Sequence, residues 1–382
     1  MKYDDLQAKG YCFVGKGYKP LCVTKRGLLT WRRHRLYLFD GNDRFAPLCE
    51  FACSMKEKVM ESIRLLERLA RSEPQSAVSV DDEVYIARRH DVCKLDLTTG
   101  NVPENYPYRK PYIHTNRLDI IHGVHGFQNS VVYGEYLSNP KREEVCVYQK
   151  RIDSTGGFEE VYRFPAGSIR HIHGLVADAA HECVYILTGD EDGESGIWRA
   201  TENFAKVEPM LVGDQQYRAC IAFVRGTSII YATDIPSRMN SIGGYDLQEK
   251  KYTHLMQLPG TCTRGCSMGE KHIFSTSVET VEPKSRGKRD MLAYWLSRKR
   301  AVGIVDDYPR MYMEDENGGF QEILKLKKDL WPSGAFRFGH VLPVYDAQKE
   351  RLYIYPTAVK RYDGKLYAIS AKKLREGVNG SK

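Results

Sequence analysis

The chain has 382 residues, a formal net charge of +8 and 42% hydrophobic residues. This composition is that of a folded globular protein, because disordered chains contain too few hydrophobic residues to form a core. The charge is mild for a nucleic-acid-binding protein, and we interpret the basic run at 284–300 as a solvated loop. No apolar run approaches the ~20 residues that span a bilayer. We therefore expect neither nucleic acid as a partner nor membrane insertion.

The N-terminus and the cysteines indicate the cellular compartment. Residues 1–10 lack the apolar core of a signal peptide. The ten cysteines occur singly, mostly within strand-like runs, and the sequence contains no CxxC pair. Cysteines in such positions are usually small buried hydrophobic residues. We therefore predict a cytoplasmic protein with reduced thiols.

The first 73 residues combine short strands with one helix. Residues 10–51 alternate apolar runs with turns, which is typical of strands. A helix is predicted over 54–73, because Ser54 and Glu57 have the spacing of a capping box. Its apolar residues recur at spacings of three and four, so they share one face that we expect to pack on the protein body. The members of that face are Met55, Val59, Ile63, Leu66 and Leu69.

From residue 77 onward, pairs of predicted strands recur at an even step. The clearest pair is 170–178 with 183–189, and equivalent strands begin near residues 28, 77, 122, 171, 218, 264 and 338. A period of about 47 residues with about four strands in each is typical of propeller blades. We predict an all-β fold, a single seven-bladed β-propeller domain over 1–382. The helix at 54–73 and a polar, basic segment at 279–320 are insertions into it.

Two predicted outer hairpins, at 150–158 and 198–204, resemble the Asp-box turns of sialidase-like (BNR) propellers. The segments 134–140, 169–174, 188–198 and 217–234 resemble signal-less propeller proteins that are similar to sialidases and to propeller polysaccharide lyases. The resemblance covers about residues 70–280. It implies the propeller fold and glycosidase-like or lyase-like chemistry on carbohydrate. The chain lacks the Arg-Ile-Pro motif that opens sialidases, which argues against sialic-acid hydrolysis.

The blade pattern predicts which side chains gather at one face. In a propeller, the start of each first strand and the end of the next strand meet there, and polar side chains that converge in this way mark a candidate site. The predicted starts supply His122, His125, Arg170, His171, His173, Arg218, Arg264, Arg337 and His340; the predicted ends supply Glu135, Tyr136, Asp190, Asp234 and Glu279. Arginines at buried strand starts need anionic partners, so we expect an acidic carbohydrate ligand.

Two enzyme mechanisms fit these residues. In β-elimination from a uronic acid, Arg218 with Arg170 or Arg264 would neutralise the sugar carboxylate. His171 or His173 would remove the C5 proton, and Tyr217 or Tyr136 would protonate the leaving oxygen. In hydrolysis, two of Glu135, Asp190 and Asp234 would act as acid and as base or nucleophile. Since basic groups outnumber free carboxylates, we favour a polysaccharide lyase over a glycoside hydrolase.

Two further interpretations stay open. A propeller of this kind can also be a non-catalytic scaffold that binds a saccharide or a protein. The mechanisms above require no cofactor, although His122, His171, His173 and His340 with a carboxylate could bind a divalent metal.

Overall fold

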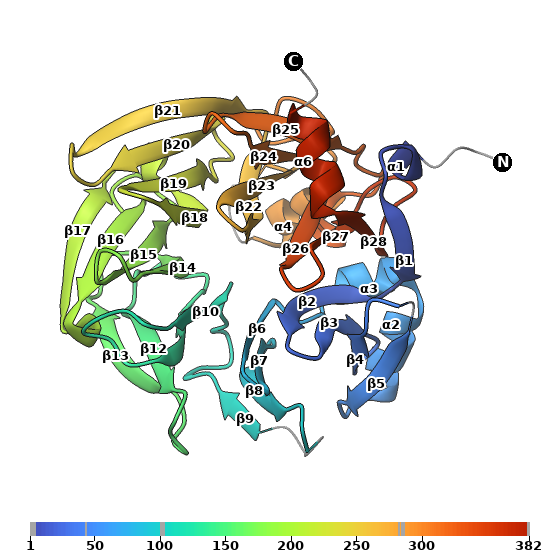
Figure 1. Ribbon diagram of the computed structural model, residues 1–382, viewed down its shortest axis with the longest axis horizontal. Coiled ribbons are helices and arrows are strands. Elements are labelled where there is room, and N and C mark those ends of the chain that lie inside the picture. The colour runs from blue at the N-terminus through green and yellow to red at the C-terminus, as the bar shows by residue number, and fades with distance from the viewer. Residues whose placement is uncertain (1–4, 43, 100–103, 282, 284–286, 380–382) are drawn as a thin grey trace. The chain divides into compact units, whose positions relative to one another are not determined.

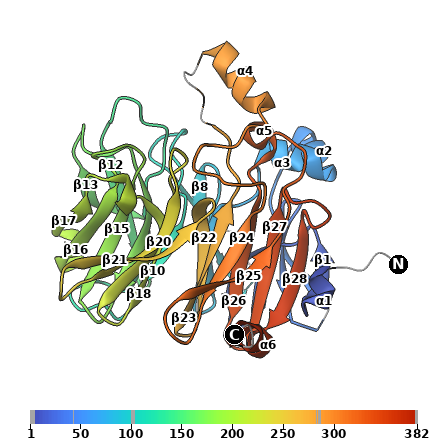
Figure 2. The same cartoon turned by 90° about the horizontal axis from the view of Figure 1, so that it is seen from above.

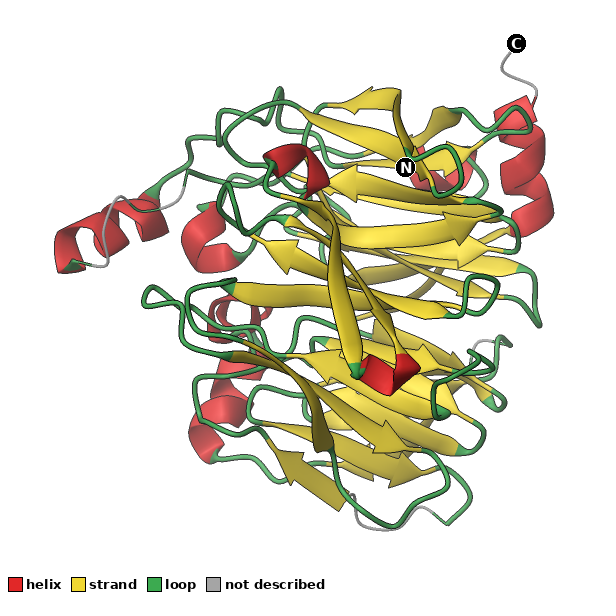
Figure 3. Cartoon of the chain, turned by 90° about the vertical axis from the view of Figure 1, so that its left-hand side faces the viewer, coloured by secondary structure: helices red, strands yellow, loops and turns green. Residues whose placement is uncertain are grey.

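The computed structural model describes residues 5–42, 44–99, 104–281, 283 and 287–379, which are mostly strand (Figures 1 and 3). They form seven four-stranded sheets, as predicted. The chain divides into two compact units: unit 1 comprises 1–72 and 227–382, and unit 2 comprises 73–226. The prediction of one domain over 1–382 stays a prediction. No helix among the described residues is long and apolar enough to cross a membrane.

Unit 2 contains three complete sheets around one hydrophobic core. The core joins apolar residues from strands β6 to β17, and β15 (Cys183–Gly189) is buried along its whole length. A strand that is buried at every position is one whose two faces are both covered. The elements are β6 (Ser76–Val80), β7 (Glu83–Ala87), β8 (Asp91–Asp96), β9 (Glu104–Pro107), β10 (Leu118–Ile121), β11 (Ser130–Gly134), β12 (Val145–Arg151), β13 (Glu159–Phe164), β14 (His171–Asp178), β15, β16 (Gly196–Thr201), η1 (Glu202–Phe204), β17 (Lys206–Val212), η2 (Gln215–Tyr217) and β18 (Ala219–Arg225).

Unit 1 contains the remaining strands and the longer helices. Strand β1 pairs with the last strand of the chain, so the two ends of the sequence complete one sheet in the order β1-β28-β27-β26. The elements are α1 (Asp5–Ala8), β1 (Cys12–Lys16), β2 (Lys19–Thr24), β3 (Gly27–Arg32), β4 (Arg35–Phe39), β5 (Phe45–Glu50), α2 (Met55–Ser62), α3 (Arg64–Ala70), β19 (Ser228–Thr233), β20 (Asn240–Asp246), β21 (Lys251–Leu258), β22 (Thr261–Met268), β23 (Lys271–Ser277), α4 (Lys288–Leu296), β24 (Arg310–Glu314), β25 (Phe320–Lys325), α5 (Ser333–Phe336), β26 (His340–Asp346), β27 (Arg351–Thr357), β28 (Lys365–Ser370) and α6 (Ala371–Asn379).

Five of the seven predicted strand starts lie within three residues of the first strand of a sheet. The exceptions are 28, where the first strand is β2 from Lys19, and 122, where β10 begins at Leu118. The first exception arises because β1 belongs to the last sheet. The first sheet therefore begins with β2, and residue 28 lies in its second strand, β3. In the second, the glycines at 123 and 126 have positive φ and form the turn after β10, so they do not belong to its start.

The helical insertion differs from its prediction. The capping box of Ser54 and Glu57 is present, but the segment forms two helices that are broken at Ile63, whose backbone is extended. The expectation that its apolar face packs on the body is wrong: of the five apolar residues, only Leu66 is not exposed. Charged residues take the inward positions instead. They are Glu61, Glu67 and Arg68.

The basic segment at 279–320 is also more ordered than predicted. Residues 288–296 form the helix α4, where we expected a solvated loop, and β24 and β25 follow it in the sheet that begins with β22. Residues 284–286 lie outside the described residues. The segment therefore contains one projecting helix and the strand β24, and β25 begins at its last residue (Figure 2).

Candidate functional site

The strand pair β14–β15 brings two histidines and an aspartate together in unit 2. His171 begins β14 and pairs with Gly189, the last residue of β15, so Asp190 follows next to it. The register shifts between Ile172 and Gly174, which places His173 beside the same carboxylate. A Cβ on Gly189 would lie 2.6 Å from Cε1 of His173, so only glycine permits this approach.

The hydrogen bonds of the two rings orient their free nitrogens. Nδ1 of His171 lies 2.9 Å from the carbonyl oxygen of Leu137, and Nδ1 of His173 lies 3.0 Å from that of Ala219. A carbonyl only accepts, so each Nδ1 carries the proton and each neutral ring has its lone pair on Nε2. The two Nε2 atoms are 3.1 Å apart, and Oδ1 of Asp190 lies 3.3 and 3.1 Å from them.

Three acceptor atoms at such distances repel one another unless a positive charge lies among them. Two arginines supply part of that charge. Arg170 contacts Oδ2 of Asp190 at 3.1 Å, and Arg218 contacts Oδ1 at 3.0 Å and the backbone oxygen of Asp190 at 2.9 Å. Arg170 also lies 3.8 Å from the carboxylate of Glu191, whose side chain is exposed. The two arginines thus share one close carboxylate, that of Asp190, and one more distant, solvated acid. The site can therefore accept an additional anion, a proton on a ring nitrogen or a metal cation.

Burial and charge act in opposite directions on the two titratable groups. Burial by itself would raise the pKa of Asp190, but His171, His173 and Arg218 hold it well below its usual range. For His171, burial lowers the pKa, and this effect exceeds the opposing attraction of Asp190. Asp190 is therefore ionised and the His171 ring is neutral near pH 7. A neutral imidazole with its lone pair directed at a fixed carboxylate is a suitable proton acceptor.

Tyr136 completes this group, which we call the Asp190 cluster: Tyr136, Arg170, His171, His173, Asp190 and Arg218. The Tyr136 ring stacks on His171 with ring centroids 4.0 Å apart, and backbone hydrogen bonds in both directions join it to His114. Tyr136 is half-buried, whereas both histidines are buried. Of the two arginines, Arg170 is the more exposed: 19% of its side chain is exposed, against 10% for Arg218.

The cluster has the ligands and spacing of a divalent metal site. His171, His173 and Asp190 are the one group of three such ligands that the described residues contain. Ligands at about 2.0–2.2 Å from a tetrahedral or octahedral ion lie roughly 3.0–3.5 Å from one another, which agrees with the 3.1–3.3 Å observed. Both rings also donate Nδ1–H to a backbone carbonyl, as metal-binding histidines usually do.

The other predicted residues of unit 2 lie outside the cluster. Glu135 is buried, and Arg109 holds both of its oxygens, at 3.0 and 2.9 Å, while the Cys146 amide donates to one of them. Its carboxylate therefore has a structural role. Tyr217 ends η2, directly before Arg218, and is half-buried.

The histidines at 122 and 125 belong to a different part of the sheet. Both follow the end of β10, whereas the start of β10 is the end that lies near β14: Ile172 donates to the backbone oxygen of Glu135, just beyond β11. The side chain of His125 is 82% exposed and is 3.5 Å from Glu182. The structure therefore does not bring His122 and His125 to His171.

Five predicted residues belong to unit 1: Asp234, Arg264, Glu279, Arg337 and His340. The carboxylate of Glu279 accepts from the hydroxyls of Thr261 and Ser277, at 2.8 and 2.7 Å. Burial, and then the charges of Arg264, Arg337 and Lys19, lower the pKa of His340 to about 3, so these four groups lie near one another. Nδ1 of His340 lies 3.0 Å from the carbonyl oxygen of Phe338. Asp234 is buried at the end of β19. Unit 1 thus has its own group of basic side chains near the starts of β22 and β26, and the expectation that they share one site with Arg170, His171 and Arg218 stays a prediction.

Sequence reasoning missed two residues that support the Asp190 cluster and one that pairs with Glu135. Gln215 donates to the backbone oxygen of Asp190 at 2.7 Å, Asn116 donates to that of His173 at 3.2 Å, and Arg109 neutralises Glu135. Gln215 could have been predicted from the sequence, because it precedes Arg218, at a predicted strand start, by three residues. Asn116 would follow only from the correct start of β10, and Arg109 lies in a loop without a pattern.

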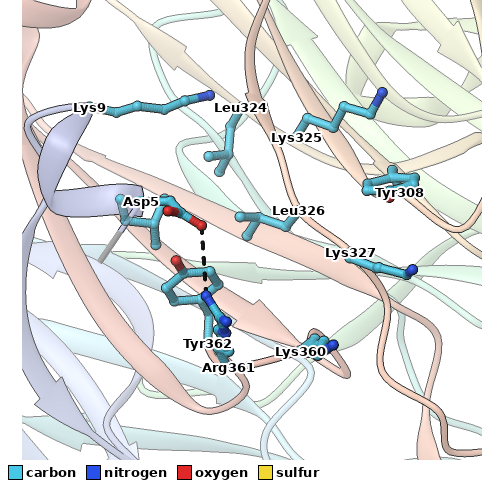
Figure 4. Close-up of a pocket in the computed structure, with 11 residues that line it drawn as sticks. Asp5, Lys9, Tyr308, Leu324, Lys325, Leu326, Lys327, Lys360, Arg361 and Tyr362 are labelled. Carbon is cyan, nitrogen blue, oxygen red and sulfur yellow. Dashed lines mark ion pairs between the residues drawn. The ribbon is translucent and has the colours of Figure 1, made fainter. Parts of the chain in front are cut away.

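A separate basic hollow opens on unit 1 (Figure 4). It has a volume of about 230 Å³ and is lined by the apolar side chains of Leu324 and Leu326 and by two tyrosines. The charged residues at its wall are Lys9, Lys325, Lys327, Lys360 and Arg361, against the single acid Asp5. Two of the lysines lie over the ring of Tyr308, with Nζ at 4.8 and 5.9 Å from its centroid. The hollow was not predicted, since its residues come from three distant segments.

No family model and no curated protein matches the chain. Solved structures do resemble it. Virginiamycin B lyase from Staphylococcus aureus is 9% identical with a TM-score of 0.56, covering 94% of this chain and 97% of the other. An oligogalacturonate lyase in complex with manganese is 11% identical, also with a TM-score of 0.56, covering 95% and 91%. A chain of the mitotic checkpoint complex reaches 0.53 at 6% identity, covering 94% and 89%.

These likenesses identify the fold as a seven-bladed β-propeller, in agreement with the seven sheets and the prediction. At such identities they show the fold alone, and lyases stand beside a protein of another kind among them. The resemblance to Asp-box propellers stays a prediction. In the structure, the first of the two predicted turns is held by Lys150, whose ammonium group donates to the backbone oxygens of Ser154 and Gly156.

Proposed function

We propose that this protein cleaves a uronate-containing saccharide by β-elimination, with the Asp190 cluster as its catalytic centre. The observation that carries the proposal is the convergence of two Nε2 lone pairs on one carboxylate between two arginines. The lyases among the structural neighbours support the choice, because a propeller has the scaffold for this chemistry. The residues of this chain carry the argument for the reaction.

The reaction needs a base, a neutralised carboxylate and an acid. The base removes the C5 proton, its electron pair forms the C4–C5 double bond, and the C4–oxygen bond breaks as the leaving oxygen takes a proton. Nε2 of His171 or His173 is the proposed base, and the new N–H would donate to Oδ1 of Asp190. Tyr136, stacked on His171, is the proposed acid, with Tyr217 as the alternative.

Arg170 would neutralise the sugar carboxylate as charge develops on it. Because both rings are buried, the saccharide must approach past Arg170, the more exposed arginine. We propose that Arg170 exchanges Asp190 for the substrate carboxylate while Arg218 stays on Asp190, which it contacts through two atoms. The planar guanidinium group of Arg170 would then pair with a planar carboxylate, which it can contact through two parallel hydrogen bonds.

A divalent cation would fit the same centre through His171, His173 and Asp190. Bound there, it would supply positive charge for the carboxylate of the substrate, and it would occupy the Nε2 lone pairs, so it is an alternative to the role of either histidine as base. Removal of metal by a chelator, followed by addition of Mn²⁺, Mg²⁺ or Zn²⁺, tests this, with calorimetric binding as a readout independent of turnover. Loss of metal binding in His173→Ala, and its persistence in His122→Ala, is the expected result.

The test of the function is incubation with a panel of acidic polysaccharides and their oligomers. New near-ultraviolet absorbance marks the unsaturated uronate, and His173→Ala should lower its rate roughly 10²–10⁴-fold. His122→Ala is the matched control, since His122 is an exposed histidine of the same unit. New reducing ends without this absorbance would replace the proposal with hydrolysis. Binding without turnover would replace it with a saccharide-binding scaffold.

Hydrolysis has less support from the contacts. A glycosidase of the predicted kind needs two carboxyl groups at the cleaved bond. Both carboxylate oxygens of Glu135 are paired with Arg109. Asp190 is surrounded by four basic side chains that hold it ionised. An ionised carboxylate in this state is a poor general acid, which favours the lyase.

A further inference from the structure

The helices at one end of unit 1 have their apolar side chains directed outward. On α2 and α3 the exposed fractions are 73% for Met55, 57% for Val59, 57% for Ile63 and 44% for Leu69. On α4, Leu292, Trp295 and Leu296 are exposed by 55%, 50% and 65%, and no residue of that helix is buried. The spacing of three and four places these three side chains on one face.

These helices adjoin one another. α2 contacts α3, α3 contacts α5, and α5 contacts α4, and Figure 2 shows them together beyond the ends of the strands. Leu330 and Trp331, just before α5, are exposed by 79% and 46%. We call this surface the helical layer: α2, α3, α4 and residues 330–336. Of the 15 large hydrophobic side chains exposed among the described residues, nine belong to it, which is more clustered than scattered surface residues would be.

The layer is held firmly by its charged residues. Arg68 donates to the backbone oxygen of Phe336 at 2.7 Å and contacts Asp329 at 2.5 Å. Arg64 contacts Asp363 at 3.2 Å, and Arg71 donates to the backbone oxygen of Gly334 at 2.7 Å. Burying charge and exposing apolar groups both cost free energy. A fold that bears both costs over the same helices presents this apolar face for contact with something else.

Exposed basic residues lie within α2 and on both sides of the apolar residues of α4 in the sequence. Lys56 and Lys58 lie on the exposed surface of α2, while Lys288 and Arg289 begin α4 and Arg298 and Lys299 follow its end. All six are exposed. The acid Glu57 in the same stretch is engaged by the Ser54 cap. Tryptophan and leucine beside lysine and arginine on a short helix are typical of helices that lie in a membrane interface.

We infer that the helical layer is a peripheral docking surface for a bilayer with anionic head groups. The nine residues of α4 are too few to span it, so the contact is interfacial. The lysines argue for lipid over a protein partner, because lysine is depleted in protein interfaces, whereas each basic group near an anionic surface strengthens binding. Trp295 and Leu296 would enter the interface while Arg298 and Lys299 contact the head groups.

The experiment uses the full chain and sedimentation with vesicles of phosphatidylcholine alone or mixed with phosphatidylserine. We expect binding to the anionic vesicles, a fall with added salt, and a partition coefficient at least roughly tenfold lower in Leu292→Ser/Trp295→Ser. The charge variant Arg298→Glu/Lys299→Glu should also weaken binding. Its matched control is Lys325→Glu/Lys327→Glu, which changes net charge equally at the basic hollow of Figure 4 and should bind as the unaltered protein does.

Three outcomes would overturn the inference. The first is no sedimentation with anionic vesicles, and the second is sedimentation that the α4 variants leave unchanged. The third is equal weakening by the two charge variants, which would mean that binding depends only on the net charge of the protein. Light scattering is run in parallel. An oligomer that Leu292→Ser/Trp295→Ser dissociates, with no vesicle binding, would assign the layer to a second copy of the chain. Thermal unfolding confirms that each variant is folded.

Discussion

The Asp190 cluster of unit 2 and the helical layer of unit 1 distribute polar and apolar groups in different ways. In the cluster, the charged side chains lie at strand ends, and their functional atoms converge within about 3 Å of one another. In the layer, buried charged side chains join the helices to the rest of the unit, and apolar side chains face outward. Buried charge alone therefore does not mark a site; what distinguishes the cluster is the convergence of two Nε2 atoms on one carboxylate oxygen.

The largest effect is expected for Asp190→Asn. Loss of this carboxylate leaves the buried Arg218 and the half-buried Arg170 without the counter-charge that both contact, which should cost about 3–5 kcal/mol of unfolding free energy. Denaturant titration measures it. Asp153→Asn, an exposed aspartate of the same unit, is the control and should change stability little. A loss below about 1 kcal/mol would mean that the cluster is not closed as described.

A smaller effect is expected for Arg68→Met in the layer. The change keeps an unbranched apolar stem but removes the contacts of the guanidinium with Asp329, Asp363 and the Phe336 carbonyl, which should cost about 2–4 kcal/mol. The neighbouring exposed Leu69→Ser should cost about 0.5 kcal/mol or less. If Leu69→Ser lowers the unfolding free energy more than Arg68→Met does, the helices are not oriented with their apolar face outward.

The pH dependence provides a third comparison. A buried histidine with a lowered pKa is neutral when folded but takes up a proton when unfolded, so stability falls as pH falls below the unfolded value of about 6.5. One such group contributes at most about 1.4 kcal/mol per pH unit. For His340, whose folded pKa is about 3, this slope extends from about pH 6.5 towards 3. Chemical unfolding between pH 4 and 7 should show a shallower slope in His340→Gln, and an unchanged slope would contradict it.

The smallest effect is expected for the outward side chains of the layer. Leu292→Ser and Trp295→Ser remove exposed apolar surface, so unfolding free energy should change by no more than about 0.5 kcal/mol. Thermal scans of both variants measure it. A drop of several kcal/mol in either would show that α4 packs against the protein and would remove the basis for membrane docking.

Much of the fold was accessible from the sequence, while the site was accessible only in part. Strand patterning and an even step predicted seven sheets, and the residues around 170–190 were correctly expected to converge. His122 and His125 were placed at the wrong end of β10, because a run of Ile, His and Gly continues beyond the strand into its turn. Glu135 was expected at the site, and nothing in the sequence indicated that Arg109 would occupy it.

Local residue order determined the strands, their alternation and the capping box at Ser54, since these depend on neighbours within a few positions. It also determined that the helices have one apolar face. Only the tertiary structure decided which way that face points, because amphipathicity separates two faces without stating which one meets the protein. The same holds for Asp190: its spacing from His171 was readable, but the two arginines and the direction of each Nε2 follow from carbonyls and side chains on other strands.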